Sequence, residues 1–119
     1  MKIFFRVILV SMIISSLFLS LSSAPHSVPM VWNDKLIHCI SYFLLMMVLD
    51  FSYNASKQLL IKAVLILIYS GLIEYAQGFI PGRETSLADL LANGVGIMLF
   101  IALVPVLKQL KAYQFLKLI

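Results

Sequence analysis

The chain has 119 residues, of which 62% are hydrophobic and only 12% are charged, and its formal net charge is +4. About a quarter of the residues in a typical soluble domain are charged, so this composition excludes a soluble globule and indicates a protein embedded in lipid. The length allows one small domain. The basic residues stand singly between apolar segments, which is typical of membrane topology and excludes nucleic acid as the expected partner.

The first apolar segment, Val7 to Ser23, follows the basic residues Lys2 and Arg6. A bilayer core of about 30 Å needs about 20 apolar residues as a helix, so we expect a transmembrane span here. The segment also resembles a signal peptide, with "SSA" as a cleavage motif, but Pro25 directly after the motif disfavours cleavage. We therefore expect residues 1–24 to form an uncleaved first span or signal anchor.

Three more apolar segments predict the remaining spans: about Leu36 to Phe51, about Leu59 or Ala63 to Ile80, and about Leu87 to Leu107. In lipid, each segment must satisfy its own backbone polar groups, so the spans are expected to be helices. Short connections make consecutive helices antiparallel neighbours. The sequence predicts an all-α integral membrane bundle of four transmembrane helices, forming a single domain over residues 1–119.

The C-terminal stretch 108–119, "KQLKAYQFLKLI", alternates lysines with apolar residues. This pattern predicts a cytoplasmic interfacial helix on anionic lipid, although a plain stop signal that fixes topology explains it equally well. Asp50 and Lys62 lie near the same membrane boundary and are interpreted as ordinary helix-end residues.

Lysines and arginines are divided unevenly between the two ends of the predicted spans. Because such residues are retained on the cytoplasmic side, we expect both termini to be cytoplasmic and the first and third connections to face outward. Seven basic residues lie on the expected cytoplasmic side (Lys2, Arg6, Lys57, Lys62, Lys108, Lys111 and Lys117), and two lie on the other (Lys35 and Arg83).

Polar residues recur at helical spacing near the outward ends of three predicted spans. Spacings of three and four residues place side chains on one face of a helix, so each span should present one polar face. The sets are Asp34, His38 and Tyr42 on the second span, Glu74 and Gln77 on the third, and Asp89 and Asn93 on the fourth.

A charged side chain within a span costs at least about 2.5 kcal/mol, so these residues are expected to face the bundle interior. Glu74 lies about 9 Å deeper than the Ile80–Pro81 exit of its helix, which makes it the hardest to explain as a helix-end residue. Gly71 and Gly78 flank it at i−3 and i+4 and would let a neighbouring helix approach closely.

Several of these residues also have a purely structural interpretation. "SLAD", Ser86 to Asp89, matches a capping box, so capping and function are equally supported for Asp89. Asn93 could bridge two helices by hydrogen bonding. Lys35 and Arg83 could be interface charges, or each could pair with Glu74 or Asp89. His38 alone is more often a hydrogen-bonded helix residue than a catalyst.

The chain contains no HExxH, GxSxG, P-loop or dinucleotide-binding motif. His38, Glu74 and Asp89 could ligate a metal, but they lack a fixed local spacing. The sequence therefore predicts no metal site and no cofactor.

Two segments together resemble the VanZ-like family. "DKLIHCISY", Asp34 to Tyr42, is similar to the family pattern D-K-x-x-H-x-x-x-Y. "EYAQGFIPGRETSLADLLANGVG", Glu74 to Gly96, is similar to E-x-x-Q-x-F-x-P-x-R-x-x-S-x-x-D-x-x-x-N-x-x-G. The resemblance covers about residues 33–100. The matching positions are Asp34, Lys35, His38, Tyr42, Glu74, Gln77, Phe79, Pro81, Arg83, Ser86, Asp89, Asn93 and Gly96.

The resemblance implies a small integral protein of the bacterial cytoplasmic membrane. The family is named for a protein that lowers sensitivity to the glycopeptide antibiotic teicoplanin, and its biochemical mechanism is not settled. We expect an envelope-associated accessory or binding protein that influences teicoplanin susceptibility and whose outward site holds the polar part of a lipid or lipid-linked cell-wall precursor. The expected binding residues are Asp34, Lys35, His38, Tyr42, Glu74, Gln77, Arg83, Asp89 and Asn93.

In that hypothesis Lys35 and Arg83 would pair with phosphate or carboxylate groups of the ligand. The alternative hypothesis is an intramembrane enzyme acting on a lipid-linked envelope substrate, with His38, Glu74 and Asp89 as catalytic candidates. A purely structural polar core is a further interpretation. A proton-coupled carrier is disfavoured because four short spans leave little room for a transport path built from repeats. The sequence predicts no particular oligomeric state.

Overall fold

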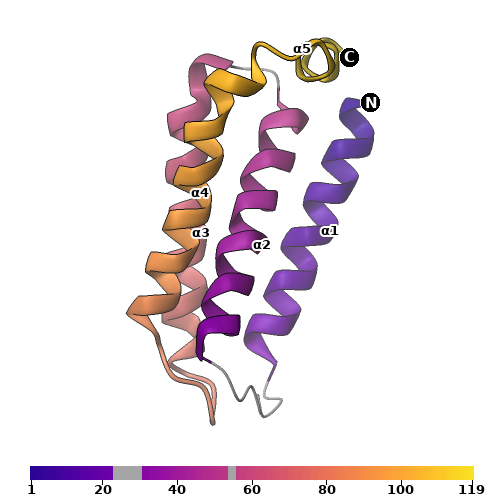
Figure 1. The fold of residues 1–119 in the computed structure, drawn as a ribbon. Coiled ribbons are helices and arrows are strands. Elements are labelled where there is room, and N and C mark those ends of the chain that lie inside the picture. Colours follow the sequence, from indigo (N-terminus) through magenta and orange to yellow (C-terminus); the bar gives the residue numbers. More distant parts are fainter. Residues whose placement is uncertain (23–30, 54–55) are drawn as a thin grey trace.

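The computed structural model describes residues 1–22, 31–53 and 56–119. The four long helices run alternately up and down, and both chain termini lie at the same end of the bundle (Figure 1). We call this end the terminal end and the opposite one the cavity end. The helices are α1 (Lys2–Leu21), α2 (Val31–Ser52), α3 (Leu59–Gln77), α4 (Leu87–Leu107) and the short α5 (Lys111–Leu118), with a 3-10 turn, η1 (Ser56–Gln58), before α3.

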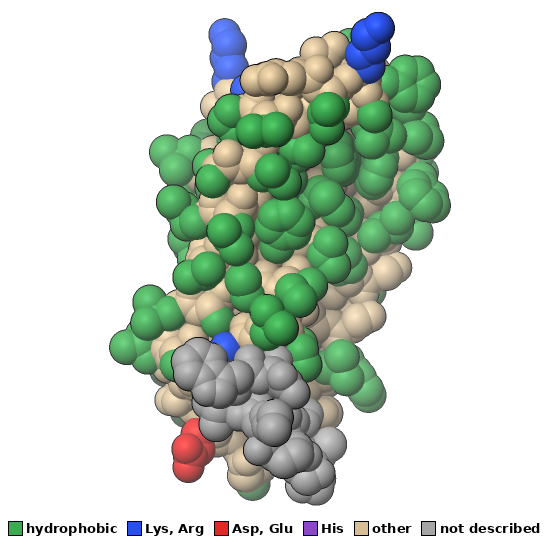
Figure 2. All heavy atoms as spheres, in the orientation of Figure 1, with side chains coloured by type: hydrophobic (Ala, Val, Ile, Leu, Met, Phe, Trp, Pro, Cys, Tyr) green, Lys and Arg blue, Asp and Glu red, His purple; other side chains and the backbone are tan. Residues whose placement is uncertain are grey.

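Helices α1 to α4 are each long and apolar enough to cross a membrane. Their outer faces expose large apolar side chains, and Figure 2 shows hydrophobic side chains along the length of the bundle. The described residues contain no β-strand. The predicted all-α bundle of four membrane-spanning helices is therefore confirmed.

The helix boundaries depart from the predicted spans mainly at their polar ends. Helix α2 begins at Val31 instead of Leu36, so Asp34 lies in its first turn. Helix α3 ends at Gln77 instead of Ile80, and the following turn contains Gly82 with a left-handed φ of 80°. A hydropathy window reports the apolar part of a helix, whereas backbone hydrogen bonding continues into polar flanks. Ser23 and Ala24 of the possible cleavage motif, and Pro25 after it, lie outside the described residues.

Helices α2 and α4 approach each other closely at Gly96. A β carbon there would collide with the carbonyl oxygen of Cys39 and lie 3.0 Å from the backbone nitrogen of Phe43. The predicted close approach at Gly71 is wrong, because a β carbon at that position would have no neighbour within 4 Å. At Gly78 the near neighbour is a side chain of the following loop and not another helix. Gly96 therefore sets how closely the polar faces of α2 and α4 can meet.

A buried ionic cluster closes the terminal end, where α5 packs against α2. The Asp50 carboxylate, 1% exposed, lies 2.9 Å from Lys62 Nζ and 2.7 Å from Lys117 Nζ, and it accepts a hydrogen bond of 2.8 Å from the Tyr113 hydroxyl. A buried carboxylate is tolerated only when it is paired in this way. The expectation that Asp50 and Lys62 are ordinary helix-end residues is therefore wrong.

Candidate functional site

The cavity end contains a hollow of about 560 Å³ between the four long helices and the α3–α4 connection. Side chains from three helices that are distant in sequence meet there because each helix turns its polar face inward. The predicted site residues all line this cavity: Asp34, Lys35, His38, Tyr42, Glu74, Gln77, Arg83, Asp89 and Asn93.

Lys35 joins the first turns of α2 and α4. Its ammonium group forms an ion pair with Asp89 Oδ1 and lies 3.4 Å from Asp34 Oδ2. About a quarter of the lysine side chain and 39% of the Asp34 side chain are exposed, so the pair lies at the mouth of the cavity. Of the two partners considered for Lys35, the structure selects Asp89.

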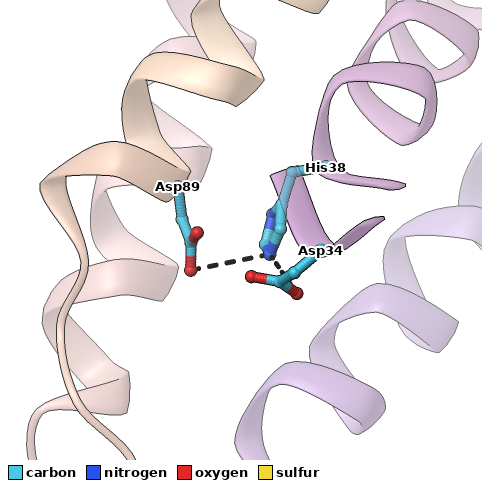
Figure 3. Close-up of side chains that lie close together, drawn as sticks. All are labelled: Asp34, His38 and Asp89. Carbon is cyan, nitrogen blue, oxygen red and sulfur yellow. Dashed lines mark ion pairs between the residues drawn. The ribbon is translucent and has the colours of Figure 1, made fainter. Parts of the chain in front are cut away.

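His38 lies between two carboxylates, as Figure 3 shows. Its Nε2 is 3.7 Å from Asp34 Oδ1 and 3.6 Å from Asp89 Oδ2. Its Nδ1 is 3.0 Å from the amide oxygen of Asn93, whose amide nitrogen donates to Ser70 Oγ at 2.7 Å. Since the amide oxygen can only accept, Nδ1 carries the hydrogen, and Nε2 is the ring nitrogen directed at the carboxylates. Asn93 bridges helices as one interpretation expected, and it also orients the imidazole.

Glu74 supports the start of α4. Its side chain is 7% exposed, and its Oε2 accepts a hydrogen bond of 3.1 Å from the backbone nitrogen of Ser86. Ser86 is the N-cap, and its hydroxyl accepts from the backbone nitrogen of Asp89 at 3.2 Å. In a full capping box the Asp89 carboxylate would return to the Ser86 nitrogen. Glu74 occupies that donor instead, which leaves the Asp89 carboxylate available to Lys35 and His38.

Gln77 and Arg83 attach α1 to this end of the bundle. Gln77 Nε2 donates to the Ser20 carbonyl at 3.1 Å, and Arg83 donates to the carbonyls of Ser22 at 3.1 Å and Leu19 at 2.7 Å. Carbonyls at a helix C-terminus lack partners within the helix, and a cation there also complements the helix dipole. Arg83 therefore does not pair with Glu74 or Asp89 in this structure; it caps α1.

The cavity lining is formally acidic. Four carboxylates face two cations, which gives a formal charge of −2 when His38 is neutral. Because both cations already have partners within the protein, the lining favours a ligand that brings donors or positive charge. Its acidic residues are Asp34, Glu74, Glu84 and Asp89, and its basic residues are Lys35 and Arg83.

Sequence reasoning missed the contribution of α1. Ser16 and Ser20 line the cavity, and Ser16 Oγ lies 2.5 Å from the Tyr69 hydroxyl. The two serines are four residues apart, the same helical spacing that marked the polar faces of the other spans. That spacing was available in the sequence. Ser41 and Glu84 were missed as well. Ser41 follows His38 by three residues, so its spacing also pointed to the polar face of α2, whereas Glu84 lies in the α3–α4 connection and has no such pattern.

Four membrane-length helices around a polar cavity at one end define a multi-pass helical membrane protein. The family model described as VanZ/LLP1 matches residues 2–108, so the chain belongs to the VanZ/LLP1 family. The match includes α1, whereas the quoted motifs lie between residues 33 and 100. No curated protein and no solved structure gives a significant match to the chain.

Proposed function

We propose that this VanZ-like protein is an envelope-associated binding protein of the bacterial cytoplasmic membrane. Its cavity would open to the outer side and hold the polar head of a lipid or a lipid-linked cell-wall precursor. The observation that carries the proposal is a polar cavity of about 560 Å³, located where four membrane-spanning helices end. Through such a ligand the protein would influence susceptibility to teicoplanin, as its family resemblance suggests.

The proposed orientation rests on the charge of the two ends. The terminal end carries Lys2, Arg6, Lys57 and the lysines of the C-terminal segment, whereas the cavity end carries Lys35 and Arg83. In Figure 2 basic side chains project from the terminal end. Cytoplasmic loops retain lysine and arginine, so the cavity end is assigned to the outside.

An amphiphile fits the composition of the cavity wall. Apolar Leu19, Ile37 and Ile73 lie beside the carboxylates and amides. Ligand sites commonly combine apolar walls with a few placed polar groups, and sites between the helices of a bundle are frequent. A head group could occupy the cavity while its chains stay in the bilayer. Because Arg83 is used to cap α1, we assign recognition to the carboxylates and Lys35 and not to Arg83.

A cavity-filling substitution tests the binding proposal. Ser41→Trp introduces a large side chain at the cavity wall, and Ile40→Trp places the same side chain at the neighbouring exposed position of α2, which does not line the cavity. Native mass spectrometry of protein extracted from bacterial membranes should show bound lipid for the wild type and for Ile40→Trp, and loss of it for Ser41→Trp. Equal lipid adducts in all three proteins would refute the cavity as the binding site.

The same three proteins test the link to the antibiotic. Expressed at equal membrane abundance in a Gram-positive host, the wild type and Ile40→Trp should lower teicoplanin sensitivity, and Ser41→Trp should not. If none of them changes sensitivity while the lipid adducts follow the expected pattern, the binding function stands and the teicoplanin role is wrong for this protein.

A second candidate function is an intramembrane enzyme, favoured by the fixed ring of His38. Its Nε2 faces Asp89 within the cavity, as a general acid or base would require. Glu74, bound to the Ser86 nitrogen, would then position α4 and not act on the substrate. For an enzyme, His38→Gln should retain lipid adducts but accumulate unconverted lipid. A pure binding protein would show the same lipid species in both proteins.

A further inference from the structure

We infer that Asp34, His38 and Asp89 form a binding site for a divalent transition-metal cation such as Mn²⁺ or Zn²⁺. The three side chains each offer one ligand atom, and these atoms lie within 4.8 Å of one another. Figure 3 shows the imidazole directed toward both carboxylates. This set differs from the one considered from the sequence, because Asp34 takes the place of Glu74.

The spacing of the ligand atoms suits a shared metal ion. His38 Nε2 is 3.6 Å from Asp89 Oδ2 and 3.7 Å from Asp34 Oδ1. Both separations are too long for a hydrogen bond. They are close to the edge of a coordination tetrahedron, which is about 3.4 Å when the metal–ligand bonds are about 2.1 Å. The two distances from the imidazole therefore need to change by only a few tenths of an ångström for a shared cation, and all three ligand atoms already lie within 4.8 Å of one another.

Lys35 does not use the oxygens that such an ion requires. Its ammonium group contacts Asp34 Oδ2 and Asp89 Oδ1, whereas the oxygens facing His38 are Asp34 Oδ1 and Asp89 Oδ2. Each carboxylate thus directs one oxygen to the lysine and the other to the imidazole. The lysine holds the two aspartates in place from one side and leaves the second side available.

The surroundings of His38 are those of a metal-binding imidazole. Metal-ligating histidines donate the hydrogen of their other ring nitrogen to a fixed acceptor. Here that acceptor is Asn93, which is 2% exposed and is itself held by the fully buried Ser70. These two residues lie outside the ligand set, and they fix the tautomer that leaves Nε2 free to bind a cation.

The charge of the site also favours a divalent cation. Asp34 and Asp89 together with Lys35 carry a formal charge of −1. A bound divalent ion would change this charge to +1 and would keep at least one coordination position open toward the cavity. On the proposed function, a phosphate oxygen of a lipid head would fill that position. This would explain how an acidic cavity with no spare arginine could hold an anionic head.

Mn²⁺ binding to the purified protein tests the site without any lipid ligand. After removal of metal with EDTA, the protein in detergent is titrated with Mn²⁺, and the free ion is measured by electron paramagnetic resonance. We expect one Mn²⁺ per chain, displaced by Zn²⁺, with affinity at least tenfold weaker in Asp34→Asn and in His38→Gln. Glu84→Gln removes one carboxylate of the same cavity outside the ligand set, and its affinity should stay within about twofold of the wild type.

Pulsed electron paramagnetic resonance adds a direct readout, because a bound imidazole nitrogen gives a characteristic modulation that His38→Gln should abolish. Three results would overturn the inference: no saturable binding of Mn²⁺ or Zn²⁺, equal weakening by Glu84→Gln, or bound Mn²⁺ without nitrogen coupling. Circular dichroism checks that each variant is folded. If His38→Gln fails to fold, the Mn²⁺ affinity of Asp34→Asn, a change at a partly exposed residue, serves as the test. Failure of metal binding would leave the lipid-binding proposal intact, since the two are measured separately.

Discussion

Both ends of the bundle place carboxylates beside lysines, but they do so in opposite ways. At the terminal end, Asp50 is 1% exposed, and two ammonium groups and a hydroxyl surround its side chain. At the cavity end, Asp34, Lys35 and His38 keep between a quarter and two fifths of their side chains exposed. The first arrangement is closed and complete, whereas the second has polar atoms directed at open space.

This difference teaches how to separate structural from functional charges inside a membrane bundle. Burying an ion costs several kilocalories per mole, and only full pairing compensates for that cost. A cluster that uses all its groups internally has nothing left for a ligand. A cluster that leaves part of its groups facing a cavity requires another explanation, and a ligand site provides one. We therefore base the functional proposals on the cavity end and interpret the cluster at the terminal end as stabilising the fold.

The largest expected effect is at the closed end. Asp50→Asn leaves the buried Lys62 and the largely buried Lys117 without a counter-charge, so we expect a loss of about 3–5 kcal/mol in the free energy of unfolding. The matched change at the open end, Asp34→Asn, should cost less than about 1 kcal/mol, because exposed ion pairs contribute little. Reversible unfolding in mixed detergent micelles measures both. Similar losses in the two variants would show that the ends do not differ in the way described.

A second test disturbs the geometry of the open end through its backbone. Gly96→Ala would place a β carbon against the Cys39 carbonyl and should destabilise the bundle by about 1–3 kcal/mol. It should also move α4 away from α2 and weaken Mn²⁺ binding at His38 and Asp89. The control is Gly71→Ala, which has open space around it and should be neutral or slightly stabilising, since alanine favours helix. Equal effects of the two changes on metal binding would contradict the role given to Gly96.

A third test concerns the attachment of α1. Arg83→Ala removes two hydrogen bonds to the last carbonyls of α1 and should cost about 1–2 kcal/mol locally. Hydrogen exchange should then increase in the C-terminal half of α1 and not near Phe5, which packs against Phe51 at the other end. Arg83→Lys should restore part of the protection. If exchange increased equally along the whole of α1 in the alanine variant, Arg83 would not act specifically on the C-terminal end of that helix.

Much of the open end could be predicted from the sequence, because it depends on spacing within single helices. Asp34 and His38, or Asp89 and Asn93, share a helix face through their spacing alone, and apolar segments fix where each helix lies in the membrane. The partners of single residues could not be predicted in this way. Arg83 reaches α1 over 61 residues or more of chain, and Asp50 meets Lys117 over 67. Such contacts depend on how whole helices pack.

The dependence on helix packing also explains why the sequence predicted a close helix approach at the wrong glycines. Gly71 and Gly78 have the right spacing from Glu74, but spacing along one helix does not tell which face meets a neighbour closely. Gly96 matches the family pattern, but that resemblance does not show which helix packs against it. Its importance comes from the α2 backbone opposite it, which only the packed bundle shows.

The smallest expected effect is a pH dependence that arises at the closed end. Burial, together with the hydrogen bond to Asp50, raises the pKa of Tyr113 above its ordinary value of 10.0. A group whose pKa is raised by folding stabilises the folded state fully below its unfolded pKa, and that stability is lost as the pH rises through the folded pKa. Wild-type protein should therefore begin to lose stability above about pH 10.

Lys117 acts in the opposite direction, because burial lowers its pKa below the ordinary value of 10.5, so its contribution increases as the pH rises toward that value. Tyr113→Phe separates the two effects. The variant should be less stable than the wild type at neutral pH, since it lacks the hydrogen bond to Asp50, but the difference should shrink above pH 10, where only the wild type has a tyrosine at position 113 to ionise. Unfolding measured in detergent from pH 8 to 11 tests this. Parallel stability curves for the two proteins would show that the Tyr113 hydroxyl is not held protonated by the closed cluster.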